Sequence, residues 1–157
     1  MKIIVVSDSH GNKKGIEKIF QTLQFDYFLF LGDGLKDLGD YIYLDNVFAV
    51  AGNCDYFSSE PIERVFNANG VLIFYTHGHK YSVKSSLWQI KQQGRLEHAD
   101  IVLFGHTHIP FIEKIDDIIL ANPGTFQAKT GGDCGALEIN ISDDKKIDIK
   151  PITINIK

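Results

Sequence analysis

The chain has 157 residues, of which 44% are hydrophobic, and this is enough for one domain to bury a core without disulfides. The formal net charge of −4 excludes the broad basic surface that stable binding of nucleic acid needs. We therefore expect a single domain over residues 1–157 and no nucleic acid as a stable partner.

The chain also lacks sequence signals for membranes and export. No apolar run approaches the roughly 20 residues that span a bilayer, so we expect no membrane as a partner. The first apolar run directly follows Met1-Lys2 and is too short for the core of a signal peptide. Cys54 and Cys134 follow no disulfide-framework or zinc spacing. A reducing cytoplasm is the expected location, and the sequence leaves a homo-oligomer open.

Short apolar runs alternate with segments of helical spacing as far as residue 104. The runs, which we interpret as buried strands, cover residues 2–6, 27–31, 47–51, 71–75 and 101–104. Apolar residues recur at helical spacing over residues 16–23, 35–42 and 83–90, the last segment closing before Gly94. Residues 56–69 show no clear period, and we expect them to be irregular. The alternation predicts an α/β architecture with mostly parallel strands.

The pattern changes after Pro110. Residues 111–115 and 118–121 flank Asp116-Asp117, as the strands of a hairpin do. Residues 137–141 and 147–156 alternate apolar with polar side chains, which is typical of half-buried antiparallel strands. We expect these C-terminal strands to form a second sheet that packs on the first.

All five apolar runs end in side chains that can bind a metal ion. These side chains, in chain order, are Asp8 and His10, Asp33, Asn53, His77 and His79, and His106 and His108. Ligands of open α/β sheets bind beyond the carboxyl ends of the strands. Five of the six histidines lie at these ends, so we expect the side chains to converge on one site.

The fifth end, Gly105-His106-Thr107-His108, is the most informative. Residues i and i+2 of an extended chain point the same way, so both imidazoles can face one spot. Neutral imidazole is the commonest metal ligand among side chains.

The donor types narrow the chemistry further. Aspartate, asparagine and histidine without thiolate suit Mn²⁺, Fe²⁺, Co²⁺, Ni²⁺ or Zn²⁺ better than Ca²⁺ or an iron–sulfur cluster. About seven ligands are too many for one structural zinc, which takes four, and fit two ions that share a carboxylate. Two such ions, roughly 3.5–4 Å apart, can activate a hydroxide and hold the oxygens of a phosphoryl group.

Five ordered motifs resemble those of the calcineurin-like metallophosphoesterases, and the closest branch is the small YfcE-type phosphodiesterases. They are Ser-Asp-x-His-Gly at 7–11, Gly-Asn-Cys-Asp at 52–55, Thr-His-Gly-His at 76–79, Gly-His-Thr-His at 105–108 and Asn-Pro-Gly at 122–124. The resemblance implies a four-layer α/β/β/α sandwich of two mixed sheets flanked by helices. It also implies a metal-dependent phosphodiesterase that acts on a small phosphodiester or another phosphorylated substrate.

The resemblance also assigns roles to residues. It implies two divalent ions, with Mn²⁺ the first choice and Ni²⁺, Co²⁺, Fe²⁺ or Zn²⁺ as alternatives. One ion would be held by Asp8, His10, Asp33 and His108, and the other by Asp33, Asn53, His77 and His106, with Asp33 as the bridge. The catalytic residues would be Asp33, Asn53 and His79.

Two positions depart from the wider superfamily. Many members have histidine where this chain has Cys54, and that histidine is thought to protonate the leaving group. A thiol is a weaker candidate acid, which favours diesters with an acidic leaving group over alkyl monoesters. Asp37 stands one place late for the second acid of Gly-Asp-x-x-Asp, so we assign it no role.

Simpler interpretations remain open for several of these residues. Asp8 and Asp33 could be helix N-caps, Asn53 could be a turn residue, and His79 could orient a neighbour or lie on the surface. The alternative function is a protein-binding scaffold, because the retromer complex contains a subunit of similar fold that serves mainly as a scaffold.

Overall fold

The computed structural model describes residues 1–128 and 133–155, which form two mixed sheets and four helical segments. The first sheet contains β1 (Lys2–Val6), β2 (Tyr27–Phe30), β3 (Val47–Ala49), β9 (Asp133–Ile141) and β10 (Ile147–Asn155). The second contains β4 (Glu63–Ala68), β5 (Val71–Thr76), β6 (Ile101–Leu103), β7 (Phe111–Ile115) and β8 (Ile118–Asn122). The helical segments are α1 (Lys13–Thr22), α2 (Trp88–Leu96) and the 3₁₀ segments η1 (Leu35–Tyr43) and η2 (His79–Tyr81).

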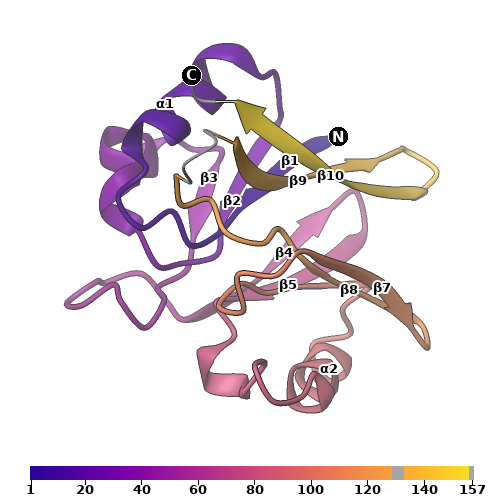
Figure 1. Cartoon of the computed structure of the whole chain (residues 1–157). Helices are drawn as coiled ribbons and strands as arrows, with labels where there is room; N and C mark the ends of the chain where they lie inside the picture. Colours follow the sequence, from indigo (N-terminus) through magenta and orange to yellow (C-terminus); the bar gives the residue numbers. More distant parts are fainter. Residues whose placement is uncertain (129–132, 156–157) are drawn as a thin grey trace.

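The two sheets pack face to face, with α1 outside the first and α2 outside the second (Figure 1). The strand orders are β10-β9-β1-β2-β3 and β4-β5-β6-β8-β7. Parallel pairs join β1 to β2, β2 to β3, β5 to β6 and β6 to β8, and the other pairs are antiparallel. These layers confirm the predicted four-layer α/β/β/α sandwich.

Strand β1 shows why its sequence is continuously apolar. Successive side chains of a strand point to opposite faces. Ile3 and Val5 therefore pack in the cluster between the sheets, and Ile4 and Val6 pack under α1. All four side chains are fully buried, as expected for a strand that is covered on both faces.

The outer helices are fitted closely to the sheets. Asn12 begins α1, because its side-chain oxygen accepts a hydrogen bond from Gly15 N at 3.0 Å. On the other side, Ile90 of α2 packs in a cluster with Phe74 and Val102. A Cβ atom on Gly94 would lie 2.4 Å from Val102 Cγ2, so this glycine allows α2 to approach β6.

Two predictions about elements were wrong, and the helical segment predicted over residues 35–42 is confirmed in 3₁₀ form. The helix predicted from residue 83 begins at Trp88 and continues through Gly94, which packs inward as described. Residues 63–68, expected to be irregular, form β4, and Asn69-Gly70, both with positive φ, make the tight turn to β5. The segment 35–42 forms a 3₁₀ helix that is broken at Gly39.

The C-terminal strands were also misplaced by the sequence analysis. They do not form a sheet of their own, because β9 and β10 extend the first sheet beside β1, and β7 and β8 extend the second beside β6. The predicted 111–115 and 118–121 hairpin is confirmed. The last residue predicted for the final strand, 156, lies outside the described residues.

The five apolar runs are therefore divided between the two sheets. Strands β1, β2 and β3 belong to the first, and β5 and β6 to the second. The single domain over residues 1–157 stays a prediction. No helix among the described residues is long and apolar enough to cross a membrane.

Strands β1, β9 and β10 are joined on one face by charged side chains, which gives a pH-dependent contribution to stability. Glu138 lies 2.9 Å from Lys150 Nζ and 3.5 Å from Lys2 Nζ. The hydrogen bond from Lys150, with help from Asn140, lowers the pKa of Glu138 from 4.5 to about 2. A lowered pKa means stabilisation that is present above pH 4.5 and lost as the pH falls toward about 2.

We predict that Glu138→Gln lowers the free energy of unfolding at neutral pH by less than about 1 kcal/mol, because the pair is near the surface. The difference should disappear in urea unfolding near the lower end of this pH range. Glu113→Gln, at an exposed position of β7, is the control. A Glu138→Gln deficit that stays constant as the pH falls would contradict the role of the ion pair.

Candidate metal centre

Among the described residues, three groups of three side chains bring their donor atoms within 4.8 Å of one another, and two of these groups consist of aspartate and histidine alone. Asp8, His10 and His108 form the first group, and Asp33, His77 and His106 form the second. Asp8 and His10 follow β1, Asp33 follows β2, His77 follows β5, and the other two histidines follow β6. The structure thus brings together six of the eight residues that the sequence singled out.

Asp8 is fully buried and organises the first group. Its Oδ2 atom accepts hydrogen bonds from Ser7 Oγ at 2.5 Å and from His106 N at 3.0 Å. Its Oδ1 atom lies 3.0 Å from His108 Nε2 and 3.6 Å from His10 Nε2. One oxygen is therefore used by the protein, and the other lies near three imidazoles, because His77 Nε2 is also 3.9 Å away.

Asp33 lies between the two groups. Its Oδ1 atom accepts a hydrogen bond from Cys54 N at 2.7 Å. Its Oδ2 atom lies 3.3 Å from His77 Nε2 and 3.9 Å from His10 Nε2. Burial raises the pKa of Asp33, but the nearby His77 ring and the hydrogen bond from Cys54 N outweigh it and hold the pKa well below its usual range. The carboxylate is therefore ionised at neutral pH.

His77 provides the clearest sign that a cation fits here. Its Nδ1 atom donates to Leu31 O at 2.8 Å, which leaves the lone pair of the neutral ring on Nε2. Nε2 is buried and has no hydrogen bond among the described residues, although such an atom costs about 1–3 kcal/mol when unpaired. Burial lowers the pKa of His77, but Asp33 and Asp8 outweigh it and raise the pKa. The site therefore attracts positive charge.

His106 completes the second group with its ring centroid 5.1 Å from that of His77. Burial, with His77 and Lys84 nearby, lowers the pKa of His106 to about 4. The ring is neutral at pH 7 and keeps a lone pair, as a metal ligand requires. The donor set is thus two carboxylates and four imidazoles, which fits a divalent transition metal.

The loops that carry these residues are strained. Five non-glycine residues of the two groups have positive φ values: Asp8 (55°), His10 (40°), Asp33 (59°), His106 (65°) and His108 (61°). Such conformations are uncommon outside glycine and cluster at functional sites. The helix N-cap interpretation of Asp8 and Asp33 is wrong, because α1 is capped by Asn12 and Gly34 precedes η1.

Asp55 is the residue that the sequence analysis missed. Its Oδ2 atom accepts from Asp33 N at 2.7 Å and Gly52 N at 2.8 Å, and its Oδ1 atom accepts from Gly34 N and Leu35 N, both at 2.9 Å. One carboxylate thus fixes the loop after β2 against the loop after β3. Its place at the end of the Gly-Asn-Cys-Asp motif was the available signal.

Two further polar residues position the loops. Asp37 is buried, and its Oδ2 atom accepts from Ser9 Oγ at 2.5 Å and from Gly11 N at 2.8 Å. It therefore ties the loop of His10 to η1. Asn122 is fully buried and donates to Gly105 O at 2.9 Å, which holds the loop that follows β6.

Asn53 and His79 are less closely tied to the two groups. Asn53 is exposed, and its Nδ2 atom donates to Cys54 Sγ at 3.4 Å. His79 is half-buried in η2, with its ring 5.4 Å from that of His77. Its Nδ1 atom has no hydrogen bond among the described residues. The ligand role of Asn53 and the catalytic role of both residues stay predictions.

Cys54 also faces the site. Its sulfur lies within 4.8 Å of donor atoms of His10 and Asp33. Burial and the Asp33 carboxylate raise the pKa of this thiol, so it remains protonated at neutral pH.

The arrangement has counterparts among known proteins. Residues 1–143 match the calcineurin-like phosphoesterase superfamily domain. The chain is 28% identical to the probable metallophosphoesterase YsnB of Bacillus subtilis, over 81% of this chain and 76% of that protein. It is 28% identical to the phosphodiesterase MJ0936 of Methanocaldococcus jannaschii, over 98% and 99% of the two chains. It is 25% identical to the phosphodiesterase YfcE of Escherichia coli, over 84% and 83%.

Solved structures show the same fold. The crystal structure of a predicted phosphoesterase from Streptococcus pneumoniae has a TM-score of 0.76 at 25% identity, with 97% of both chains covered. A structure of Vps29 from Entamoeba histolytica, in complex with zinc, has a TM-score of 0.75 at 18% identity, with 98% of this chain and 99% of that chain covered.

The role of Asp55 gives a prediction for the protein without metal. Asp55→Asn replaces one acceptor oxygen by an amide nitrogen, so two of the four backbone N–H groups lose their partner. We expect the free energy of unfolding in chelator to fall by about 2–4 kcal/mol, and metal affinity to fall by about 10–100-fold. Asp45→Asn, at an exposed loop position, is the matched control. Equal unfolding of the two variants would show that Asp55 does not hold the loops.

Proposed function

This chain belongs to the calcineurin-like phosphoesterase superfamily, and we propose that it is a phosphodiesterase that works with two divalent metal ions. The names of MJ0936 and YfcE support the reaction class, and the donor types support the metals. The observation that carries the proposal is the position of Asp33 between the two groups of ligands.

Asp33 offers what a bridging ligand needs. Its Oδ2 atom faces His77 on one side and His10 on the other, at 3.3 and 3.9 Å. In our proposal it binds both ions. Asp8, His10 and His108 complete the first ion's ligands, and Asn53, His77 and His106 complete the second ion's ligands.

The charges of the site suit a phosphodiester anion. Asp8 and Asp33 supply two negative charges, so two divalent ions leave the site positive. When bound, such ions activate the attacking water and stabilise the charge on the phosphoryl oxygens. Mn²⁺ is our first choice, and Ni²⁺, Co²⁺, Fe²⁺ and Zn²⁺ suit the same donors.

His79 and Cys54, which lie beside the two ligand groups, would contact the substrate. His79 Nδ1 has no hydrogen bond among the described residues, and its ring lies 5.4 Å from that of His77, so we assign His79 a contact with the phosphoryl group or the leaving group. Cys54 stands where the wider superfamily has a histidine, and a thiol is a poorer proton donor. We therefore propose diesters whose leaving group departs without much protonation, ahead of alkyl monoesters.

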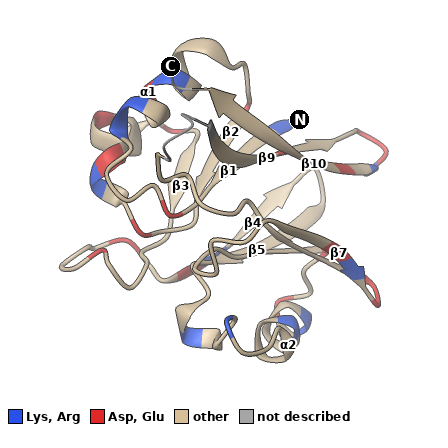
Figure 2. Cartoon of the chain, viewed as in Figure 1, with Lys and Arg blue, Asp and Glu red and all other residues tan. Residues whose placement is uncertain are grey.

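The charge distribution favours a small substrate. Lys and Arg are mixed with Asp and Glu on α1 and β7 (Figure 2), and the net charge is −4. A stable complex with a long nucleic acid would need a basic stripe. We expect a small phosphodiester, no stable nucleic-acid or membrane partner, and a cytoplasmic location. A homo-oligomer stays open.

A scaffold function is the second candidate, because the chain shares its fold with Vps29. The donor set of two carboxylates and four imidazoles favours the enzyme. Turnover of an aryl phosphodiester with Mn²⁺ would support the enzyme. Absence of turnover, together with stoichiometric capture of one partner from lysate, would support the scaffold.

We predict that Asp33→Asn lowers kcat/KM for bis(p-nitrophenyl) phosphate with Mn²⁺ by about a thousandfold or more, because bound ions contribute several kcal/mol of transition-state stabilisation. Asp117→Asn, in the exposed turn between β7 and β8, should keep the wild-type rate. Near-full activity of Asp33→Asn would remove Asp33 as the bridge.

Metal binding should also stabilise the fold. At a hundredfold excess over its dissociation constant, a ligand of the native state adds about 2.7 kcal/mol to the free energy of unfolding. Urea unfolding in Mn²⁺ and in chelator should show this difference for the wild type and a smaller one for His108→Ala. Identical curves for the wild type in both buffers would speak against a metal site.

A further inference from the structure

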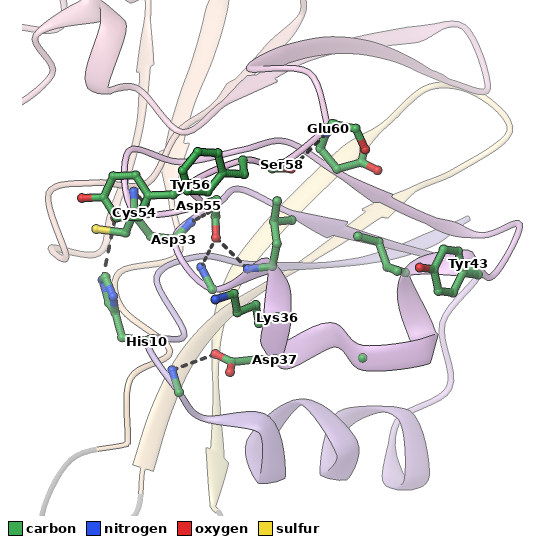
Figure 3. Close-up of a pocket in the computed structure, with 17 residues that line it drawn as sticks. His10, Asp33, Lys36, Asp37, Tyr43, Cys54, Asp55, Tyr56, Ser58 and Glu60 are labelled. Carbon is green, nitrogen blue, oxygen red and sulfur yellow. Dashed lines mark hydrogen bonds and ion pairs between the residues drawn. The ribbon is translucent and has the colours of Figure 1, made fainter.

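A pocket of about 660 Å³ runs from the metal centre along residues 54–60. His10, Asp33 and Cys54 line it at one end, and Tyr43 and Glu60 line it at the other (Figure 3). Its volume is within the range of about 300–1,000 Å³ that is typical of small-molecule sites. The pocket is therefore continuous with the place where a phosphoryl group would bind.

Three aromatic side chains of the pocket are exposed to solvent, and two of them, Tyr56 and Phe57, are adjacent in the chain. Tyr56 is 76% exposed and Phe57 is 106% exposed, and both line the pocket. Phe57 also has a φ of 63°, a strained conformation for a residue with a bulky side chain. Neither ring contributes to the core, and backbone strain of this kind clusters at functional sites.

The loop that carries the two rings is fixed at both ends. Asp55, directly before Tyr56, accepts four backbone N–H groups. At the other end Glu60 forms an ion pair with Arg64 at 3.0 Å. Between these ends, Ser58 N donates to Asp55 O at 3.4 Å, and this hydrogen bond closes a turn over residues 55–58. The rings are thus presented by a supported loop.

Lys36 is a positively charged side chain of the pocket that has no ion-pair partner among the described residues. Four acidic side chains line the pocket, and each is already engaged: Asp33 by Cys54 N, Asp55 by backbone N–H groups, Asp37 by Ser9 and Gly11, and Glu60 by Arg64. Lys36 is exposed and lines the same pocket. It has no ion pair among the described residues, so its charge is available to an anionic ligand.

We infer that this pocket is the recognition subsite for one ester group of the substrate, and that this group is a nucleoside. Tyr56 and Phe57 provide aromatic faces against which a planar base can stack. Lys36, Ser58 and Ser59, which also line the pocket, provide polar groups for the edges of the base and for the sugar. A purely alkyl group would make no hydrogen bonds to these polar groups. The inference rests on the proposed function only in placing the phosphoryl group at the metal centre.

Equilibrium binding tests the subsite without turnover. Saturation-transfer NMR in chelator should detect adenosine 5′-monophosphate, with the strongest transfer at the base protons, and should not detect ribose 5-phosphate. The double variant Tyr56→Ala/Phe57→Ala should weaken this binding by about tenfold or more, since aromatic stacking of a base is worth about 1–3 kcal/mol. Trp88→Ala, at an exposed aromatic outside the pocket, is the control and should bind as the wild type does.

Three results would overturn the inference. They are unchanged binding by the double variant, equal loss in Trp88→Ala, and binding of phenyl phosphate as tight as that of the nucleotide. The third result would assign the pocket to any aryl group and not to a nucleoside. Because both rings are exposed, the double variant should fold normally, and a melting curve checks this.

Turnover separates this inference from the proposed function. The p-nitrophenyl ester of thymidine 5′-monophosphate and methyl p-nitrophenyl phosphate share a leaving group and differ only in the nucleoside. With Mn²⁺, the wild type should prefer the first in kcat/KM, and the double variant should lose about tenfold of that preference. Turnover of neither ester would refute the phosphodiesterase. Turnover of both with an unchanged ratio in the double variant would refute the nucleoside subsite alone.

Discussion

The site depends on three carboxylates that are held by backbone N–H groups, and two of them, Asp8 and Asp33, are buried. Asp8 accepts from His106 N, Asp33 accepts from Cys54 N, and Asp55 accepts from four N–H groups. A buried charge costs several kcal/mol unless it is paired, and these pairs come from loops that follow four different strands. The loops can therefore keep their positions without a cation, and the donor atoms are preorganised for one.

The same arrangement explains where strain and unpaired atoms are found. Positive φ values at non-glycine residues cost about 1–3 kcal/mol each, and five of them lie in the two ligand groups. His77 Nε2 adds a buried atom without a partner. The three apolar clusters of the sandwich stabilise the chain against these costs. In our proposal, bound ions offset part of them.

The sequence predicted that the six side chains of the two ligand groups come together, because each apolar run ends in a possible donor and strand ends of α/β proteins meet on one side. The sequence could not predict which sheet each strand joins. In β9, apolar and polar side chains alternate as in any half-buried strand, and only the packing of the folded chain places β9 beside β1. The Asn69-Gly70 pair is a known sequence signal for a tight hairpin turn, but the hairpin was not predicted. The role of Asp55 was hidden, because its partners are backbone N–H groups that the sequence does not reveal.

The central claim is that Asp33 joins two cations, and anomalous scattering from crystals grown with Mn²⁺ tests it most directly. We predict two anomalous peaks. One should lie among Asp8, His10 and His108, the other between His77 and His106, and the carboxylate of Asp33 should contact both. A single peak, or two peaks of which only one contacts Asp33, would contradict the account.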